Sequence, residues 1–215
     1  MTFERFTPYA KLAHTLLPAN DMSADGSHDV SHLIRVWNNA KIIQADEGGD
    51  LELLAAAVLL HDCVQVPKDS PNRSGASMLA AQRAREVLAK LGWNPSRIEV
   101  VAMAIESHSF SAGMAPTSQE GCILQDADRL DAMGLIGIAR CFYTAGKMSS
   151  LLYDHADPGG AQRPLDDRQF ALDHFPKKLL KLAEGFQTEA GQRLAQERHQ
   201  SLTDFHRRFL SEIGA

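Results

Sequence analysis

Residues 51–65 read LELLAAAVLLHDCVQ, and this stretch determines how the rest of the chain is interpreted. Residues 53–60 are all leucine, alanine or valine, which predicts a helix that is buried on every side. His61 and Asp62 follow directly. Because a buried carboxylate destabilises a fold unless charges or hydrogen bonds compensate it, we expect other residues of the chain to supply partners for this pair.

The composition is that of a globular protein with one substantial core. The chain has 215 residues, of which 44% are hydrophobic and 23% charged. The formal net charge of -5 argues against a broad basic surface for nucleic acid, although a local basic pocket for a phosphate is compatible with it. We therefore expect no nucleic-acid duplex as a partner.

The lengths of the apolar runs and the spacing of the cysteines indicate where in the cell the protein is located. No apolar run approaches the roughly 18 residues that a membrane span needs, and the N-terminus has no apolar stretch of signal-peptide length. The cysteines are widely spaced and form no CxxC pair, so we expect them to be reduced. They are Cys63, Cys122 and Cys141. These features predict a cytoplasmic protein without membrane contact.

Apolar residues recur at spacings of three and four, which predicts an all-α protein in a single domain over residues 1–215. Asp50 and Asn94 have the position of helix N-caps, and Thr117 and Glu120 have the spacing of a capping box. We expect helices at about residues 4–17, 28–44, 51–64, 77–91, 95–107 and 117–145, and a further helical region at 167–213 that Pro176, Gly185 and Gly191 weaken.

Two other segments contain residues that are able to bind a metal ion. In SHDVSHLIRV, His28 and His32 are four residues apart and can share one helical face. In ILQDADRLDAMG, three carboxylates lie within an apolar helix. Asp128 and Asp131 are three apart and are neighbours on the helix, whereas Asp126 points to nearly the opposite side. The three carboxylates therefore cannot all serve one site.

A histidine, an adjacent His-Asp pair and a distant aspartate, in this order, resemble the signature of the HD-domain metal-dependent phosphohydrolases. Asp128 is preferred as the last ligand because that ligand stands in an AD-x-L context in the family, and ADRL begins at Ala127. The matching residues are His32, His61, Asp62 and Asp128. The segments SHLIRVW, LLHDCVQVPKDSP, IESHSFSA and ILQDADRLDAMGLIGIARCFYTAG also look like one bacterial subgroup, so the resemblance covers at least residues 28–146.

The resemblance implies an HD-domain helical bundle with its core at 28–146, a C-terminal helical extension at 167–213, and a divalent metal ion between central helices. It also implies hydrolysis of phosphate esters or anhydrides, often those of nucleotides. Members that bind two metals use two further histidines between the His-Asp pair and the last aspartate. Only His108 lies between Asp62 and Asp128 here, so we expect one ion.

The chemistry of the candidate ligands agrees with this implication. Two imidazoles and two carboxylates suit Mn, Fe, Co, Ni or Zn and, less well, Mg, and an octahedral ion keeps positions open for water and substrate. A water on such an ion loses a proton more readily than bulk water, and the ion offsets charge that develops on a phosphoryl oxygen.

Basic side chains near the candidate ligands are candidates for binding the phosphates of a substrate. Lys68 and Arg73 follow the His-Asp pair, and Arg129 lies in ADRL. His108 can hydrogen-bond a phosphate or act as an acid, and it is a candidate catalytic residue together with Asp62. For Lys68 and Arg73, a role as solvated loop charges is at least as well supported, and for His108 a structural role is equally well supported.

Four acidic or histidine positions lie near the ligands in the sequence, and their roles stay open. His28 and Asp29 fit a cap of the helix that carries His32 better than they fit ligands. Asp131 fits either a contact to a ligand or an ion pair with an arginine. Whether Asp126 joins the site is not decided by its spacing.

We therefore expect a soluble metal-dependent phosphohydrolase that acts on a small phosphorylated compound, with nucleotides favoured. Three reactions stay open: cleavage of nucleoside triphosphates to monophosphate and pyrophosphate, cleavage of monophosphates to nucleosides, and cleavage of phosphodiesters. The alternative is a non-catalytic HD-fold sensor or binding module with a structural metal ion. A homo-oligomer is compatible with the sequence.

Overall fold

The computed structural model describes residues 2–19, 29–64, 75–110 and 113–214. The chain forms two compact units. Unit 1 comprises Met1–Asp128 and Gln187–Gly191, and unit 2 comprises Arg129–Phe186 and Gln192–Ala215. The single domain expected over the whole chain stays a prediction.

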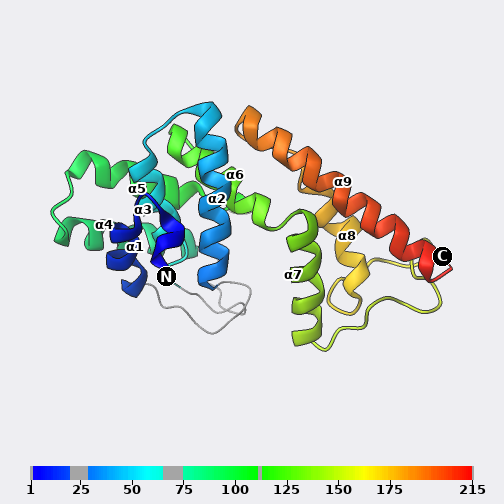
Figure 1. The fold of residues 1–215 in the computed structure, drawn as a ribbon. Helices are drawn as coiled ribbons and strands as arrows, with labels where there is room; N and C mark the ends of the chain where they lie inside the picture. Colours follow the sequence, from blue (N-terminus) through cyan, green and yellow to red (C-terminus); the bar gives the residue numbers. More distant parts are fainter. Residues whose placement is uncertain (1, 20–28, 65–74, 111–112, 215) are drawn as a thin grey trace. The chain divides into compact units, whose positions relative to one another are not determined.

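The described residues confirm the all-α fold class. Their only β geometry is an isolated bridge between Leu151 and Phe170. None of the described helices is long and apolar enough to cross a membrane. Unit 1 contains α1 (Ala10–Leu16), α2 (Val30–Glu47), α3 (Leu51–Leu60), α4 (Ala76–Lys90), α5 (Pro95–Ser107) and most of α6 (Gln119–Asp131), with 3-10 helices at Phe3–Phe6 and Leu17–Ala19 (Figure 1).

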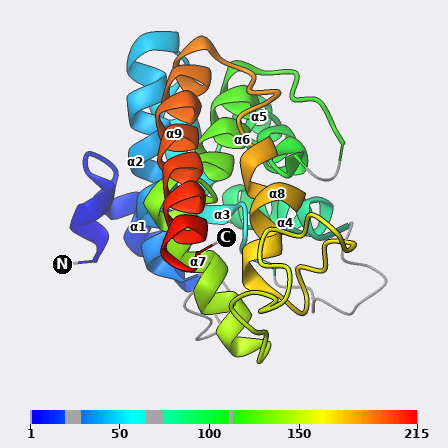
Figure 2. The ribbon, with the colours of Figure 1, turned by 90° about the vertical axis from the view of Figure 1, so that its right-hand side faces the viewer.

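Helix α3 is the central element of unit 1. Every side chain of residues 53–60 is buried, and the helix contacts α1, α2, α4 and α5 (Figure 1, Figure 2). The interpretation of this apolar run as a helix buried on every side is therefore confirmed. A helix that is apolar on every side is stable in water only when other elements cover all of its faces. The apolar run therefore places α3 at the centre of unit 1.

The caps expected for α3 and α5 are confirmed. The Asp50 carboxylate accepts hydrogen bonds from the backbone N–H groups of Glu52 and Leu53, and the Asn94 side chain accepts one from Ser96. Helix α3 ends at Leu60, earlier than the expected residue 64. The His-Asp pair therefore lies at the carboxyl end of the helix, where the helix dipole favours positive charge.

The expected helix at 4–17 is wrong in part. The structure has a 3-10 helix at Phe3–Phe6 and an α-helix only from Ala10. Pro8 lies between them, and proline lacks the N–H that would continue the helical hydrogen bonds.

The expected capping box at Thr117 and Glu120 is also wrong, by one residue. The Ser118 hydroxyl accepts the backbone N–H of Gly121 at 3.0 Å and caps α6. The Glu120 carboxylate instead accepts the backbone N–H of Asp50 at 2.8 Å. The contact of Glu120 is thus with the start of α3 and not with its own helix.

The expected helix at 117–145 is two helices, α6 and α7 (Gly134–Lys147). Gly134 has a positive φ of 62°, which L side chains rarely adopt. A Cβ atom at Gly137 would lie 2.2 Å from the Ala132 carbonyl oxygen, so the turn requires glycine there. The two glycines allow a tight turn inside a sequence whose apolar periodicity continues.

Unit 2 contains a cluster of aromatic side chains, of which Phe175 is buried. Phe142 of α7 contacts Phe175, Phe205 and Phe209. The region expected to be helical at 167–213 contains shorter elements: 3-10 helices at Ala171–Asp173 and Leu179–Lys181, α8 (His174–Lys177) and α9 (Glu189–Glu212). The expected break at Gly185 is confirmed, since this residue lies between helices with a φ of 75°. Pro176 lies within the short helix α8, and Gly191 lies in the first turn of α9 and does not interrupt it.

Candidate metal centre

His32 lies in the first turn of α2 and is buried. The Asp29 side chain accepts the backbone N–H of His32 at 3.1 Å and caps the helix, as the sequence indicated. This cap fixes where α2 begins and therefore the direction in which the imidazole leaves the helix. His28 lies outside the described residues.

His61 follows the last residue of α3 and is also buried. Its Nδ1 atom lies 2.9 Å from the Val58 carbonyl oxygen. Because a carbonyl oxygen only accepts hydrogen bonds, Nδ1 carries the proton, and the neutral ring presents the lone pair of Nε2. A hydrogen bond of this kind orients a histidine that binds a metal ion.

Asp128 lies near the end of α6, and α2 holds this part of α6 in place. The Asn39 amide of α2 donates a buried hydrogen bond of 2.9 Å to the Ala127 carbonyl oxygen. Asn39 is seven residues after His32, so both side chains lie on one face of α2. The bond therefore sets the distance between the helix that carries His32 and the helix that carries Asp128.

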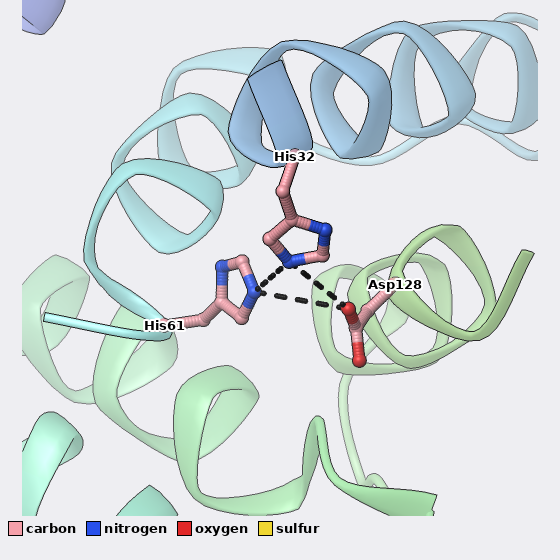
Figure 3. Close-up of side chains that lie close together, drawn as sticks. All are labelled: His32, His61 and Asp128. Carbon is pink, nitrogen blue, oxygen red and sulfur yellow. Dashed lines mark hydrogen bonds and ion pairs between the residues drawn. The ribbon is translucent and has the colours of Figure 1, made fainter. Parts of the chain in front are cut away.

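The donor atoms of His32, His61 and Asp128 converge on one point (Figure 3). The two Nε2 atoms are 3.3 Å apart, and the Asp128 Oδ1 atom is 3.4 Å from His32 Nε2 and 3.8 Å from His61 Nε2. A circle through these three atoms has a radius of about 2.0 Å, which is close to the length of a bond from zinc to nitrogen or oxygen.

Asp62 places a further carboxylate oxygen near the same two histidine nitrogens, and its side chain also groups with His61 and His108 as candidate ligands. Its Oδ2 atom lies 3.7 Å from His32 Nε2 and 3.6 Å from His61 Nε2. A circle through these three atoms also has a radius of about 2.0 Å. His32 and His61 with either carboxylate therefore fit a transition-metal ion by donor type and by spacing, and such an ion would offset the negative charge of the carboxylates.

His108 lies beside this donor set. It follows the last residue of α5, and its Nε2 atom is 3.9 Å from Asp62 Oδ1. Its Nδ1 atom contacts the Ile105 carbonyl oxygen at 2.6 Å, so Nε2 again presents a lone pair. Burial lowers the pKa of His108, and the nearby His61 lowers it further, which favours the neutral imidazole.

The other two aspartates of α6 make contacts of a different kind. The buried Asp126 carboxylate accepts hydrogen bonds from the backbone N–H groups of Gln187 and Thr188 and from the Thr188 hydroxyl. The buried Asp131 carboxylate pairs with Arg140 at 2.6 Å, which is the arginine pairing that the sequence left open. These contacts favour structural roles for Asp126 and Asp131.

The three candidate phosphate-binding residues have different outcomes. Lys68 and Arg73 lie outside the described residues. Arg129 is 7% exposed, and its guanidinium donates to the carbonyl oxygens of Glu184 and Gly185. These contacts disfavour a phosphate-binding role for Arg129, and that role stays a prediction.

Comparison with known proteins finds a family and relatives that the chain resembles. The HD domain matches residues 29–133. The protein YpgQ of Bacillus subtilis is 34% identical over 190 residues, which cover 86% of this chain and 84% of that protein.

Solved structures are similar over nearly their whole length. The crystal structure of Bacillus subtilis YpgQ in complex with ADP has a TM-score of 0.71 and 29% identity, and the match covers 94% of this chain and 98% of that chain. An HD-superfamily hydrolase from Bacillus thuringiensis has a TM-score of 0.70 and 31% identity over 100% of both chains. A predicted HD-superfamily hydrolase from an uncultured Thermotogales bacterium has a TM-score of 0.63 and 29% identity, with 95% of this chain and 92% of that chain covered.

Proposed function

The chain belongs to the HD-domain family and has the fold of an HD-superfamily hydrolase, and from this premise we propose that it is a divalent-metal-dependent phosphohydrolase of nucleotides or similar small phosphate compounds. The observation that carries the proposal is that a carboxylate oxygen of Asp62 and one of Asp128 each lie within 3.8 Å of the Nε2 atoms of both His32 and His61, which are 3.3 Å apart. We take these four residues as the ligands of one divalent ion.

The exposure of the two carboxylates favours an enzyme over the alternative of a structural metal in a binding module. The histidines are buried, but the side chains of Asp62 and Asp128 are 37% and 30% exposed. A structural metal site is closed by protein ligands, whereas a catalytic site keeps positions open. Solvent therefore reaches the two carboxylates, as an open metal site requires.

The chain's own residues have distinct tasks in this proposal. A divalent ion held by the four ligands would polarise a phosphoryl oxygen and acidify a water molecule. Asp62 uses its two oxygens differently, since Oδ2 faces the two ligand histidines and Oδ1 faces His108. Because His108 Nδ1–H donates to the Ile105 carbonyl oxygen, Nε2 is free of a proton and can accept one from water and return it to a leaving oxygen.

A nucleotide is the favoured substrate class because the related YpgQ was crystallised with ADP. ADP carries a diphosphate, which presents two phosphoryl groups to a metal site. The three reactions that the sequence left open are all compatible with this class.

The test measures hydrolysis by the purified protein after removal of bound metal and addition of Mn²⁺ or Co²⁺. A panel of nucleoside monophosphates, diphosphates, triphosphates and phosphodiesters, with separate detection of phosphate and pyrophosphate, identifies the bond that is cleaved. We expect activity that Asp62→Ala abolishes and that Asp204→Ala, which removes an exposed carboxylate of α9, leaves unchanged. Full activity in Asp62→Ala, or metal binding without hydrolysis of any compound in the panel, would contradict the proposal.

A further inference from the structure

Gln125 connects the end of α5 to the helix that carries Asp128. The side chain is 2% exposed, and its amide nitrogen donates a buried hydrogen bond of 2.7 Å to the Ser107 carbonyl oxygen. Ser107 is the last residue of α5 and directly precedes His108. Gln125 lies three residues before Asp128, so the two are neighbours on α6.

The Ser107 carbonyl is one of the last four carbonyls of α5, which by helix geometry lack partners within their own helix. A buried carbonyl without a hydrogen bond costs free energy, so a donor at this place selects one arrangement of the helix end. Gln125 supplies that donor from α6. The position at which α5 ends, and from which the His108 ring projects, is therefore tied to α6.

The orientation of the Gln125 amide is fixed from its other side. Its oxygen accepts a hydrogen bond of 3.0 Å from the Gln187 side-chain amide. Because the Ser107 carbonyl can only accept and the Gln187 amide nitrogen can only donate, Gln125 has one satisfied orientation between them. The segment that precedes α9 thus contributes to the placement of His108 within unit 1.

From these contacts we infer that Gln125 is a positioning residue for His108, holding its Nε2 atom beside Asp62 Oδ1. The inference rests on the proposed function, in which His108 moves a proton. Asn39 offers a contrast, because it bonds to the residue next to Asp128 and so positions a metal ligand. The two buried amides therefore act on different steps: Asn39 on metal binding, and Gln125 on turnover.

The test is a double-mutant cycle between Gln125→Met, which keeps the length of the side chain and removes its hydrogen bonds, and His108→Asn. We expect Gln125→Met to lower kcat about tenfold, because misplacing a general acid or base loses part of the 10²- to 10⁴-fold rate enhancement that it contributes. The Kd for Mn²⁺ should stay within about twofold of the wild-type value. In the His108→Asn background, Gln125→Met should change kcat less than about twofold. An equal loss in both backgrounds, or a much weaker affinity for Mn²⁺, would overturn the inference.

A second readout separates this inference from the proposed function. In protein labelled with ¹³C-histidine and supplied with diamagnetic Mg²⁺, Gln125→Met should shift or split the ring resonances of His108 and leave those of His32 in place. Unchanged His108 resonances overturn the inference whether or not the protein hydrolyses nucleotides. If Gln125→Met does not fold, Gln187→Met serves instead, because it removes the bond to the Gln125 amide oxygen, keeps the Gln125 bond to the Ser107 carbonyl, and should produce a smaller change in the same direction.

Discussion

The Nε2 atoms of His32 and His61 lie 3.3 Å apart, although the residues are separated by 29 positions in the chain. The Val58 carbonyl holds the proton of His61 on Nδ1, so the atom that faces His32 is a lone-pair donor. Two nitrogen atoms at this spacing, with a carboxylate oxygen of Asp62 and one of Asp128 nearby, form an arrangement that a cation stabilises. Of the His-Asp pair at the end of α3, His61 is buried and Asp62 is partly exposed, and a bound cation would account for both positions.

Removal of a proposed ligand should weaken metal binding strongly. We predict that His61→Ala raises the Kd for Mn²⁺ by more than about 100-fold, since even partners of ligands contribute 10- to 100-fold. Isothermal titration calorimetry measures the effect. His155→Ala, at an exposed histidine of unit 2, is the control and should bind as the wild type does. Equal affinities for the two variants would argue against His61 as a ligand.

Loss of the buried amide of Asn39 should weaken metal binding without removing a ligand. Asn39→Leu deletes the hydrogen bond to the Ala127 carbonyl and should raise the Kd for Mn²⁺ about 10- to 100-fold. Asn38→Leu makes the same substitution at the adjacent, more exposed position and should change the Kd little. Calorimetric titration with Mn²⁺ measures the Kd of both variants. A wild-type Kd for Asn39→Leu would show that Asn39 does not position the ligand Asp128.

The close approach of α9 to Asp126 should make Gly191 intolerant of a side chain. A Cβ atom at Gly191 would lie 2.4 Å from Asp126 Oδ2 and 2.7 Å from the Thr188 hydroxyl oxygen. Gly191→Ala should therefore lower the free energy of unfolding by about 1 to 3 kcal/mol, as overpacked sites do. In Gly146→Ala, the new Cβ meets open space on α7, and the variant should be neutral or more stable by up to about 1 kcal/mol. Urea denaturation measures the free energy of unfolding of both variants. Equal values would show that the structure around Gly191 moves to accommodate the methyl group at little cost.

The ion pair of Asp167 should make the stability of the protein depend on pH in the acid range. A hydrogen bond from Lys177, with a second from His174, lowers the pKa of Asp167 from 3.8 to about 2. Because the pKa is lower in the folded state, the pair stabilises the fold above pH 3.8, and this contribution is lost as the pH falls toward about 2.

Thermal unfolding between pH 5 and about 2 tests this effect. Asp167→Asn should flatten the fall in stability across this range, whereas Asp204→Asn, at an exposed aspartate of α9, should retain it. If the stability of Asp167→Asn falls with pH as steeply as that of the wild type, Asp167 does not cause the pH dependence.

The fold and the donor set were predictable from the sequence where the signal is local. The apolar run before His61 identifies a buried helix, and the Asp50 and Asn94 caps act within four residues of themselves. The order of the ligand residues is likewise visible in the chain. The structure brings their donor atoms together, and their role as metal ligands stays a prediction until an ion is observed.

The parts that the sequence did not reveal depend on contacts between distant segments. The break between α6 and α7 occurs inside an apolar pattern that predicts one helix, and the positive φ of Gly134 and the close approach at Gly137 account for it. Asn39 and Gln125 bond to backbone carbonyls of other helices, and a carbonyl has no sequence signature. The one available signal was the position of Asn39 on the His32 face of its helix, seven residues away.

The most direct measurement of the central claim is an anomalous difference map from crystals of the protein grown with Mn²⁺. We predict one peak at about 2.0 to 2.3 Å from four ligand atoms: Nε2 of His32, Nε2 of His61, and one carboxylate oxygen each of Asp62 and Asp128. Water should occupy at least one further coordination position. A map without a peak at these four residues, or a peak whose coordination is closed by protein atoms alone, would contradict it.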